Sequence, residues 1–231
     1  MATQAPESLV QRAMQAVREH IKANDLKVGD TLPGEGHFVD RLGVSRAVIR
    51  EAFGGLAALR LIDVGNGRRA RVGAIDGSVM ATSLDHAIAT AQVSVQEVWD
   101  VRRTLELRTA ELAAINRTDA EAAEIMRHAR GITEAGEDQD LRTMHDLAFH
   151  ASIARASHNN LFLQIVRAFA PMMEIAIPAA WHTRKAEIER EQILQLHQAL
   201  AEAIEGRDAD AARIAMDAHF DASIRDQLVA S

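Results

Sequence analysis

The chain has 231 residues, 48 % of them hydrophobic and 3 % aromatic, with a formal net charge of −7 and no cysteine. This composition suits one large or two modest globular domains, and it excludes disulfides and thiolate metal sites. No run of about eighteen apolar residues occurs, so neither a membrane span nor a membrane partner is expected. Residues 1–9 lack the basic start and apolar block of a secretion signal, so we expect a cytoplasmic protein.

The charge is divided unevenly along the chain. Residues 1–80 hold 11 Lys or Arg against 9 Asp or Glu, whereas the remainder holds 15 against 24. Because local charge sets the affinity for phosphate, only the first part is expected to bind nucleic acid. A single weakly cationic module should bind modestly, which favours a homodimer on a two-part site.

Three helices are predicted in the first part of the chain. Amphipathic spacing indicates one over residues 9–23, and a second over 35–42 that ends at Gly43. Ser45 is a good N-cap for the third, because its hydroxyl can accept a hydrogen bond from a free N–H of the first turn. The apolar face of this third helix consists of Ile49, Ala52, Phe53 and Leu56.

The opposite face of the third helix carries two arginines. Arg46 and Arg50 are four residues apart and project together, and their guanidinium groups suit a guanine edge or a phosphate in the major groove. An ordinary surface helix with solvated charges would show the same two residues. Late in this helix, Gly54 and Gly55 each cost on the order of 1 kcal/mol relative to alanine, so a close packing contact or a bend is expected there.

A hairpin is predicted after the third helix. Residues 61–64 and 68–72 have the pattern of two strands, and residues 65–67 have the Gly-Asn-Gly sequence of a turn. Arg68, Arg69 and Arg71 lie at or beside its tip. Two helices joined by a glycine-containing turn and followed by a hairpin predict a winged helix-turn-helix domain, which we assign to residues 1–73.

This segment resembles the DNA-binding domain of the GntR family of bacterial transcription regulators. The resemblance lies in Gly29-Asp-x-Leu-Pro-x-Glu35, Val44-Ser-Arg46 and Ile49-Arg-Glu-Ala52. It implies that DNA is contacted by Ser45, Arg46 and Arg50 of the third helix and by Gly67, Arg68 and Arg69 of the wing. The family usually has a DNA-reading arginine where this chain has Gly36, so one base contact is expected to be missing.

The rest of the chain is predicted to be a linker, residues 74–83, followed by an antiparallel helical bundle, residues 84–231. Capping boxes begin two of its helices, at Ser94 with Glu97 and at Thr118 with Glu121. Its helices are predicted over 83–91, 94–116, 118–134, 138–157, 160–176, 185–205 and 208–228, with breaks at Gly136, Pro178 and Gly206. The fold class is therefore mostly α, a winged helix-turn-helix followed by an all-α bundle.

Several polar residues fall on faces of the bundle that should be apolar. Arg102 lies in a buried row, where a cation is costly unless it has a partner, so it snorkels out, pairs with a core carboxylate or binds the carboxylate of a ligand. Asp146 and His150 share one helix face, and His197 and His219 point inward from two other helices. These four could converge on zinc, nickel or manganese, or each histidine could be a hydrogen-bonded core residue.

A second resemblance bears on this choice. The segments Val98-x-x-Val-Arg-x-x-Leu-Glu106, Asp146-x-x-Phe149-His150 and Met216-x-x-His219, with Asn159 and His197, resemble the FCD-type ligand-binding domain of the FadR subfamily of GntR regulators. This resemblance implies one divalent transition metal per chain, with zinc preferred, held by Asp146, His150, His197 and His219. It also implies a small carboxylate effector that reaches the metal, with Arg102 and Asn159 assigned to effector binding.

These expectations combine into a hypothesis of function. A homodimer binds a pseudo-palindromic operator in double-stranded DNA and represses a catabolic operon until a hydroxy- or sugar-acid metabolite releases it. A metal-dependent hydrolase is an alternative, since an Asp/His₃ centre can activate water, but the chain has no His-Glu-x-x-His motif. A regulator of the same fold that senses an acyl chain without metal is disfavoured, because four polar ligands would spoil an apolar pocket.

Overall fold

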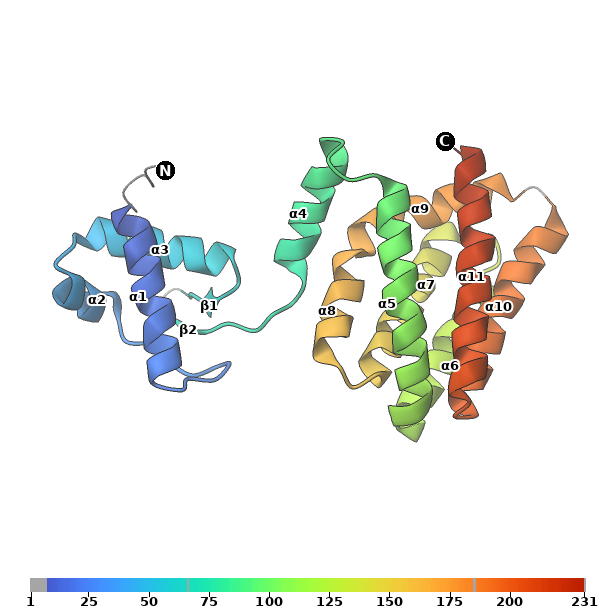
Figure 1. Ribbon diagram of the computed structural model, residues 1–231, viewed down its shortest axis with the longest axis horizontal. Coiled ribbons are helices and arrows are strands. Elements are labelled where there is room, and N and C mark those ends of the chain that lie inside the picture. Colours follow the sequence, from blue (N-terminus) through green and yellow to red (C-terminus); the bar gives the residue numbers. More distant parts are fainter. Residues whose placement is uncertain (1–7, 66, 185, 231) are drawn as a thin grey trace, which may run out of the picture. The chain divides into compact units, whose positions relative to one another are not determined.

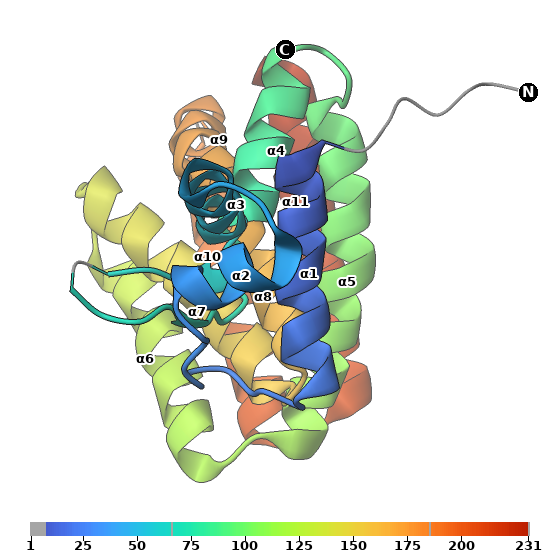
Figure 2. The same cartoon turned by 90° about the vertical axis from the view of Figure 1, so that its left-hand side faces the viewer.

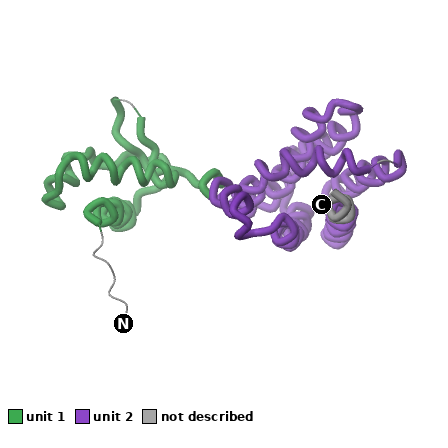
Figure 3. Tube along the Cα trace, turned by 90° about the horizontal axis from the view of Figure 1, so that it is seen from above, with its two compact units in different colours: residues 1–79 green, residues 80–231 purple. Residues whose placement is uncertain are grey.

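The computed structural model describes residues 8–65, 67–184 and 186–230 of the chain. It divides into two compact units, residues 1–79 and 80–231, which are coloured separately in Figure 3. The division falls within residues 74–83, the segment predicted as a linker. Each unit has a hydrophobic core of its own, and the two are described separately.

The first unit is a winged helix-turn-helix. It contains α1 (Leu9–Ala23), α2 (Glu35–Leu42), α3 (Arg46–Ala58), β1 (Ile62–Asp63) and β2 (Arg71–Val72). The two strands are antiparallel with Ile62 opposite Val72, and Thr31 adds a further bridge to Arg71. The core is made by side chains of all three helices and of the hairpin, among them Val17, Leu32, Phe38, Ile49, Leu56 and Ile62. The predicted fold of this unit is confirmed, with strands shorter than the sequence suggested.

The turn between α2 and α3 is set by two adjacent conformational requirements. Gly43 ends α2 in the left-handed region at φ 64°, which glycine adopts without a steric penalty. Ser45 then begins α3, and its hydroxyl accepts a hydrogen bond from the N–H of Val48 at 3.3 Å. The chain therefore reverses within a few residues, and the predicted start of α3 is confirmed.

The second unit is all-helical. Its elements are α4 (Ser78–Ala89), α5 (Val95–Asn116), α6 (Asp119–Glu134), α7 (Gln139–Ala156), α8 (Asn160–Ala168), α9 (Ala170–Thr183), α10 (Glu187–Glu205) and α11 (Ala209–Ala230). Figures 1 and 2 show the long helices of this unit running side by side. Helix α5 packs on α7 and α11, and α10 packs on α6 and α11. Their shared interior contains Phe149, Ile153, Leu200, Met216 and Phe220, all fully buried.

Three helix boundaries differ from the prediction. The single helix expected over 160–176 is two helices that meet at Phe169, because Pro171 lies in the first turn of α9, where proline favours a new helix start. Pro178, expected at a break, instead lies inside α9. Helix α4 begins at Ser78 rather than at residue 83, and the Asp76 carboxylate accepts the Ser78 N–H at 3.0 Å.

In the part of the chain that the structure describes, no helix taken singly has both the length and the apolar character to cross a bilayer. Helices α8 and α9 taken together meet the requirement by length and composition, across a bend of 57°.

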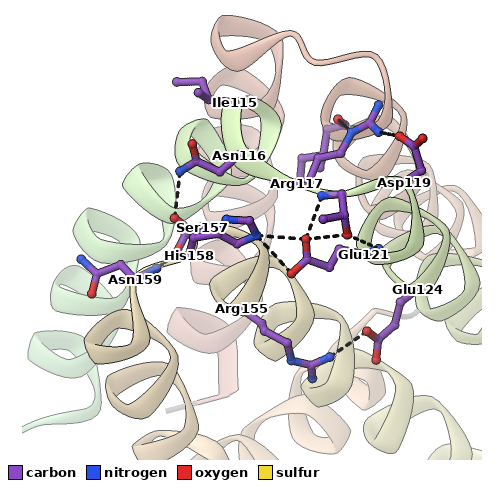
Figure 4. A network of polar contacts seen from close by, with 12 residues as sticks. Ile115, Asn116, Arg117, Asp119, Glu121, Glu124, Arg155, Ser157, His158 and Asn159 are labelled. Atoms are coloured by element: carbon purple, nitrogen blue, oxygen red, sulfur yellow. Dashed lines mark hydrogen bonds and ion pairs between the residues drawn. The ribbon is translucent and has the colours of Figure 1, made fainter.

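Polar contacts join helices at one end of the bundle, and Figure 4 shows part of this network. Arg117, just after α5, donates to the Ile204 carbonyl at 3.4 Å and also to the Glu205 carbonyl at the end of α10. On the other side, the Asn116 amide donates to the Ser157 carbonyl at 3.0 Å, just after α7. These contacts join the ends of three helices and so fix the register in which their inward faces meet.

The glycine pair in α3 generates a test of packing. An alanine Cβ at the exposed Gly54 would meet nothing within 4 Å, whereas at Gly55 it would lie 3.2 Å from the Met14 sulfur of α1, the close contact expected from the sequence. We predict that Gly54→Ala stabilises α3 by about 0.5–1 kcal/mol, and that Gly55→Ala gains less because Met14 must move. Hydrogen-exchange mass spectrometry of peptides covering α3 measures the change in helix stability in both variants. Equal protection in the two variants would contradict the contact with Met14.

Candidate metal centre and DNA-binding surface

The side chains predicted to converge in the second unit do lie together. His150 of α7, His197 of α10 and His219 of α11 are buried, and each offers one ligand atom within 4.8 Å of the other two. The Nε2 atoms of His197 and His219 are 3.1 Å apart. Asp146 places Oδ1 3.6 Å from His150 Nε2 and Oδ2 3.4 Å from His197 Nε2. The fold thus gathers one carboxylate and three imidazoles from three helices.

Several of these atoms are spaced as the ligands of one metal ion are. Ligand atoms bound tetrahedrally at about 2.0–2.2 Å from a zinc ion lie roughly 3.3–3.6 Å from one another. Three pairs of donor atoms in this cluster lie 3.1, 3.4 and 3.6 Å apart, and the ligand atoms of the three histidines all lie within 4.8 Å of one another. One carboxylate and three imidazoles are also a donor set that zinc, nickel and manganese accept. The residues present therefore fit a transition metal.

Hydrogen bonds outside the cluster fix the tautomers of two of its histidines. His197 Nδ1 lies 2.8 Å from the Ile193 carbonyl, and His150 Nδ1 lies 2.5 Å from Glu106 Oε2. Both oxygens only accept, so each Nδ1 carries the proton and donates it. In the neutral ring, Nε2 would then carry the lone pair and face the cluster, which is the tautomer that a metal ligand requires.

The buried charges favour the protonation states of a metal site. Burial lowers the pKa of His219 well below its usual value, and the neighbouring His197 and His150 lower it further. Burial alone would raise the pKa of Asp146, but its hydrogen bond and charge interaction with His197 outweigh this and hold the pKa well below the usual range. An ionised carboxylate beside a neutral imidazole is the state from which a cation binds without first displacing a proton.

Arg102 is buried and paired. Its Nε donates to Glu106 Oε1 at 2.7 Å, and its guanidinium carbon lies 4.9 Å from the centre of the Trp99 ring. Burial alone would raise the pKa of Glu106, but the charges of Arg102 and His150 outweigh it and lower the pKa to about 2. Of the roles open to Arg102 from the sequence, pairing with a core carboxylate is observed and snorkelling is not. The sequence alone gave Glu106 no role, although its spacing of four from Arg102 was a usable signal.

A cavity of about 40 Å³ lies beside the histidines. The cluster residues and Arg102 line it, together with Trp99, Met173, Ile177, Arg184, Ile193 and Ser223. The indole N–H of Trp99 is buried and has no acceptor among the described residues. Trp99 is therefore a lining residue with an unpartnered donor, and Arg184 and Ser223 are lining residues that the sequence did not single out by number.

Asn159, assigned to effector binding from the resemblance, is not among the residues that line the cavity. It is the N-cap of α8, and its side-chain oxygen accepts the Leu161 N–H at 3.1 Å. Figure 4 shows Asn159 with Ser157 and His158, at the polar end of the bundle. An asparagine that starts a helix after a left-handed residue, here His158 at φ 55°, has a local structural reason for its position.

The predicted DNA-contacting residues lie on the surface of the first unit. Arg46 and Arg50 of α3 are exposed, and Arg50 forms an ion pair with Glu35 at 3.4 Å. An exposed pair of this kind contributes little, so the arginine can exchange it for a phosphate or a base. Gly67 turns the hairpin at φ 68°, and Arg68 beside it is exposed, as is Arg69; Asn66 of the same turn lies outside the described residues.

Comparison with known proteins agrees with both halves of this description. The FCD domain family matches residues 97–222, and the gntR family of bacterial regulatory proteins matches residues 9–72. The HTH-type transcriptional regulator LutR of Bacillus subtilis is 26 % identical over 204 residues, which are 87 % of this chain and 92 % of LutR. The galactonate operon transcriptional repressor of Escherichia coli is 28 % identical over 190 residues, 80 % of this chain and 81 % of the repressor.

A solved structure, Streptococcus agalactiae GntR, has the same fold, with 22 % identity and a TM-score of 0.68 over 94 % of this chain and 99 % of that one. The family and these relatives are transcription regulators, which overturns the alternative of a metal-dependent hydrolase. The chain therefore belongs to the GntR family of bacterial transcription regulators, with a winged helix-turn-helix DNA-binding domain followed by an FCD domain.

Proposed function

We propose that the protein is a homodimeric repressor of a catabolic operon, released from its operator by a small hydroxy- or sugar-acid bound at a metal centre. The observation that carries this proposal is the convergence of Asp146, His150, His197 and His219 beside a cavity that Arg102 also lines. A relative named as the repressor of a galactonate operon supports both the sign of regulation and an acid as effector.

Asp146, His150, His197 and His219 would hold the metal, zinc in the first place and nickel or manganese as alternatives. When bound, the ion supplies positive charge and open coordination positions to an oxygen of the effector. The chain contributes the ionised Asp146 and the oriented His150 and His197, whose outer nitrogens are held by Glu106 and by the Ile193 carbonyl. The three histidines are buried and Asp146 is mostly buried, and this strengthens the electrostatic interactions of the cluster with a ligand.

The cavity defines the kind of effector. A buried water needs a cavity volume of roughly 10–15 Å³. A cavity of about 40 Å³ therefore holds a few waters or one short acid. This size favours a short hydroxy acid over a six-carbon sugar acid. Arg102 offers positive charge to a carboxylate, and the unpartnered Trp99 N–H offers a hydrogen bond to a carboxylate or hydroxyl oxygen. Met173 and Ile177 supply the apolar wall that a carbon chain would contact.

Glu106 provides a route by which the effector affects the helices. It contacts Arg102 within α5 and His150 of α7, so any movement of Arg102 toward an effector changes the contact that orients a metal ligand. The effector releases DNA only to the extent that it binds the DNA-free conformation more tightly than the DNA-bound one. In the proposed mechanism, this difference arises in the packing of α5 against α7.

DNA binding is assigned to the first unit. Ser45, Arg46 and Arg50 would approach base edges and phosphates in the major groove, and Gly67, Arg68 and Arg69 would contact the backbone from the wing. The two first units of a homodimer would bind the halves of a pseudo-palindrome. Gly36 has no side chain to offer a base, so recognition should depend more on α3 than in relatives with arginine there.

The recognition helix is tested by substitution. Arg46→Ala and Arg50→Ala should each weaken binding to a DNA fragment selected by the wild-type protein by about 10–100-fold, since each would remove a contact worth about 1–3 kcal/mol. Fluorescence anisotropy at fixed salt measures the affinity. Arg127→Ala, an exposed arginine of α6 in the second unit, is the matched control and should bind normally. Wild-type affinity in both α3 variants would show that this helix does not read DNA.

The role of Glu106 is tested separately. Glu106→Gln keeps the side-chain shape but removes the anionic acceptor of His150, and the affinity for zinc should fall about 10–100-fold. Competition with a chromophoric chelator measures it. Glu111→Gln is the matched control, because Glu111 lies on the same helix and forms only surface pairs, with Arg108 and Arg213. A Glu106→Gln variant with native helix content and wild-type zinc affinity would refute the assignment.

A further inference from the structure

We propose that the second unit carries another binding site, for a small oxyanion, around the Trp181 ring and built from Arg142, Arg184, Arg190 and Gln139. It goes beyond the proposed function because it requires neither the metal nor DNA. Its components come from three helices: Gln139 and Arg142 from the first turns of α7, Trp181 from α9 and Arg190 from α10, with Arg184 at the end of α9.

Three guanidinium groups surround one indole ring. The guanidinium carbon of Arg142 lies 3.6 Å from the centre of the Trp181 ring, that of Arg190 5.2 Å and that of Arg184 6.0 Å. Arg142, Arg184 and Trp181 are buried, and Arg190 is half-buried. Like charges held this close in a partly dehydrated place repel one another, so the arrangement needs negative charge nearby.

The chain supplies little of that negative charge to Arg142 and Arg190. The acceptors of Arg142 are the neutral side-chain oxygen of Gln139, at 2.9 Å, and the Gly136 carbonyl. Arg190 donates to the Arg184 carbonyl at 3.1 Å. Neither arginine forms an ion pair with a carboxylate in the described part of the chain, although ion pairs of other arginines are plentiful in this unit.

Glu137 and Asp138 interact with Arg142 by charge, but neither forms an ion pair with it among the described residues. Burial lowers the pKa of Arg142; Glu137 and Asp138 act against this, while Arg190 and Arg184 add to it. Asp138 is already engaged, since its carboxylate caps α7 by accepting the Leu141 N–H at 3.0 Å. Among the described residues, the positive charges of Arg142 and Arg190 are therefore incompletely balanced.

Two unpaired donors point to what completes the cluster. Arg142 Nε and Gln139 Nε2 are both buried, and neither has a hydrogen-bond partner among the described residues. Stacking on Trp181 accounts for the positions of the guanidinium groups over the ring, but it leaves these two N–H groups without acceptors. An oxyanion such as phosphate has several acceptor oxygens and negative charge, and it would satisfy both requirements at once. Arg184 also lines the effector cavity, so this site adjoins it.

The probe is inorganic phosphate, titrated into the full chain after dialysis against a chelator, with sodium chloride at the same ionic strength as reference. The Trp99→Phe variant leaves Trp181 as the single tryptophan, so its fluorescence reports this site and not phosphate on the DNA-binding unit. We expect a saturable change with phosphate and none with chloride. Adding Arg190→Gln, a half-buried position, should weaken phosphate binding at least tenfold.

Arg155→Gln in the same background is the matched control, because Arg155 is partly exposed and pairs with Glu124 away from Trp181. It should leave the phosphate affinity unchanged. Absence of a saturable response to phosphate would overturn the proposal, and so would an Arg190→Gln variant that binds phosphate as tightly as its parent. Because the metal is removed throughout, failure here would leave the metal-centred function untouched.

Discussion

A single buried carboxylate, that of Glu106, is the interaction on which the interior of the second unit depends. It lies between the guanidinium of Arg102 and the imidazole of His150, at 2.7 and 2.5 Å, and all three side chains are buried. Removing any one of the three would leave a buried charge or donor without its partner, which is far more costly than the intact set. The set therefore holds α5 and α7 in one relative position. It also fixes the orientation of the His150 ring toward the cluster.

The same arrangement explains why so polar an interior is compatible with a stable fold. Phe149, Ile153, Leu200 and Phe220 belong to the apolar core of the same bundle, so apolar packing accompanies the buried polar groups. At the far end, Arg117 and Asn116 bind helix-end carbonyls and fix the register of α5 against α7 and α10 (Figure 4). A site assembled from several helices needs that register, because a shift of one turn would separate its ligands by about 5 Å.

Local rules predicted the first unit well. Gly43 and Ser45 each impose a conformation on their own residue, and the limits of α1 and α2 follow from periodicity and turn chemistry alone. The second unit was predictable where its signals are local, as at the capping boxes of α5 and α6. Pro178 was misread because a proline inside a helix removes only one hydrogen bond, whereas the true signal for a new helix was Pro171.

The candidate site could not be predicted from local sequence patterns alone, because its residues lie on different helices. The helical periodicity of apolar residues placed His197 and His219 on inward faces of their helices. Only tertiary packing decides whether residues on different helices meet. Glu106 could have been suspected from its spacing to Arg102, yet its second contact, with His150, joins helices that are distant in sequence. Asn159 shows the opposite case, in which a motif residue serves the local start of a helix and lies outside the cavity.

The central claim is that the buried histidines are metal ligands rather than hydrogen-bonded core residues, and elemental analysis of the purified protein tests it most directly. If they are ligands, the protein should contain about one transition metal per chain, removable by dialysis against a chelator. Near-complete loss is expected in His197→Ala and full content in His158→Ala, whose histidine is exposed and pairs with Glu121. A folded wild-type chain that contains no metal and takes up none on addition of zinc, nickel or manganese would contradict the claim.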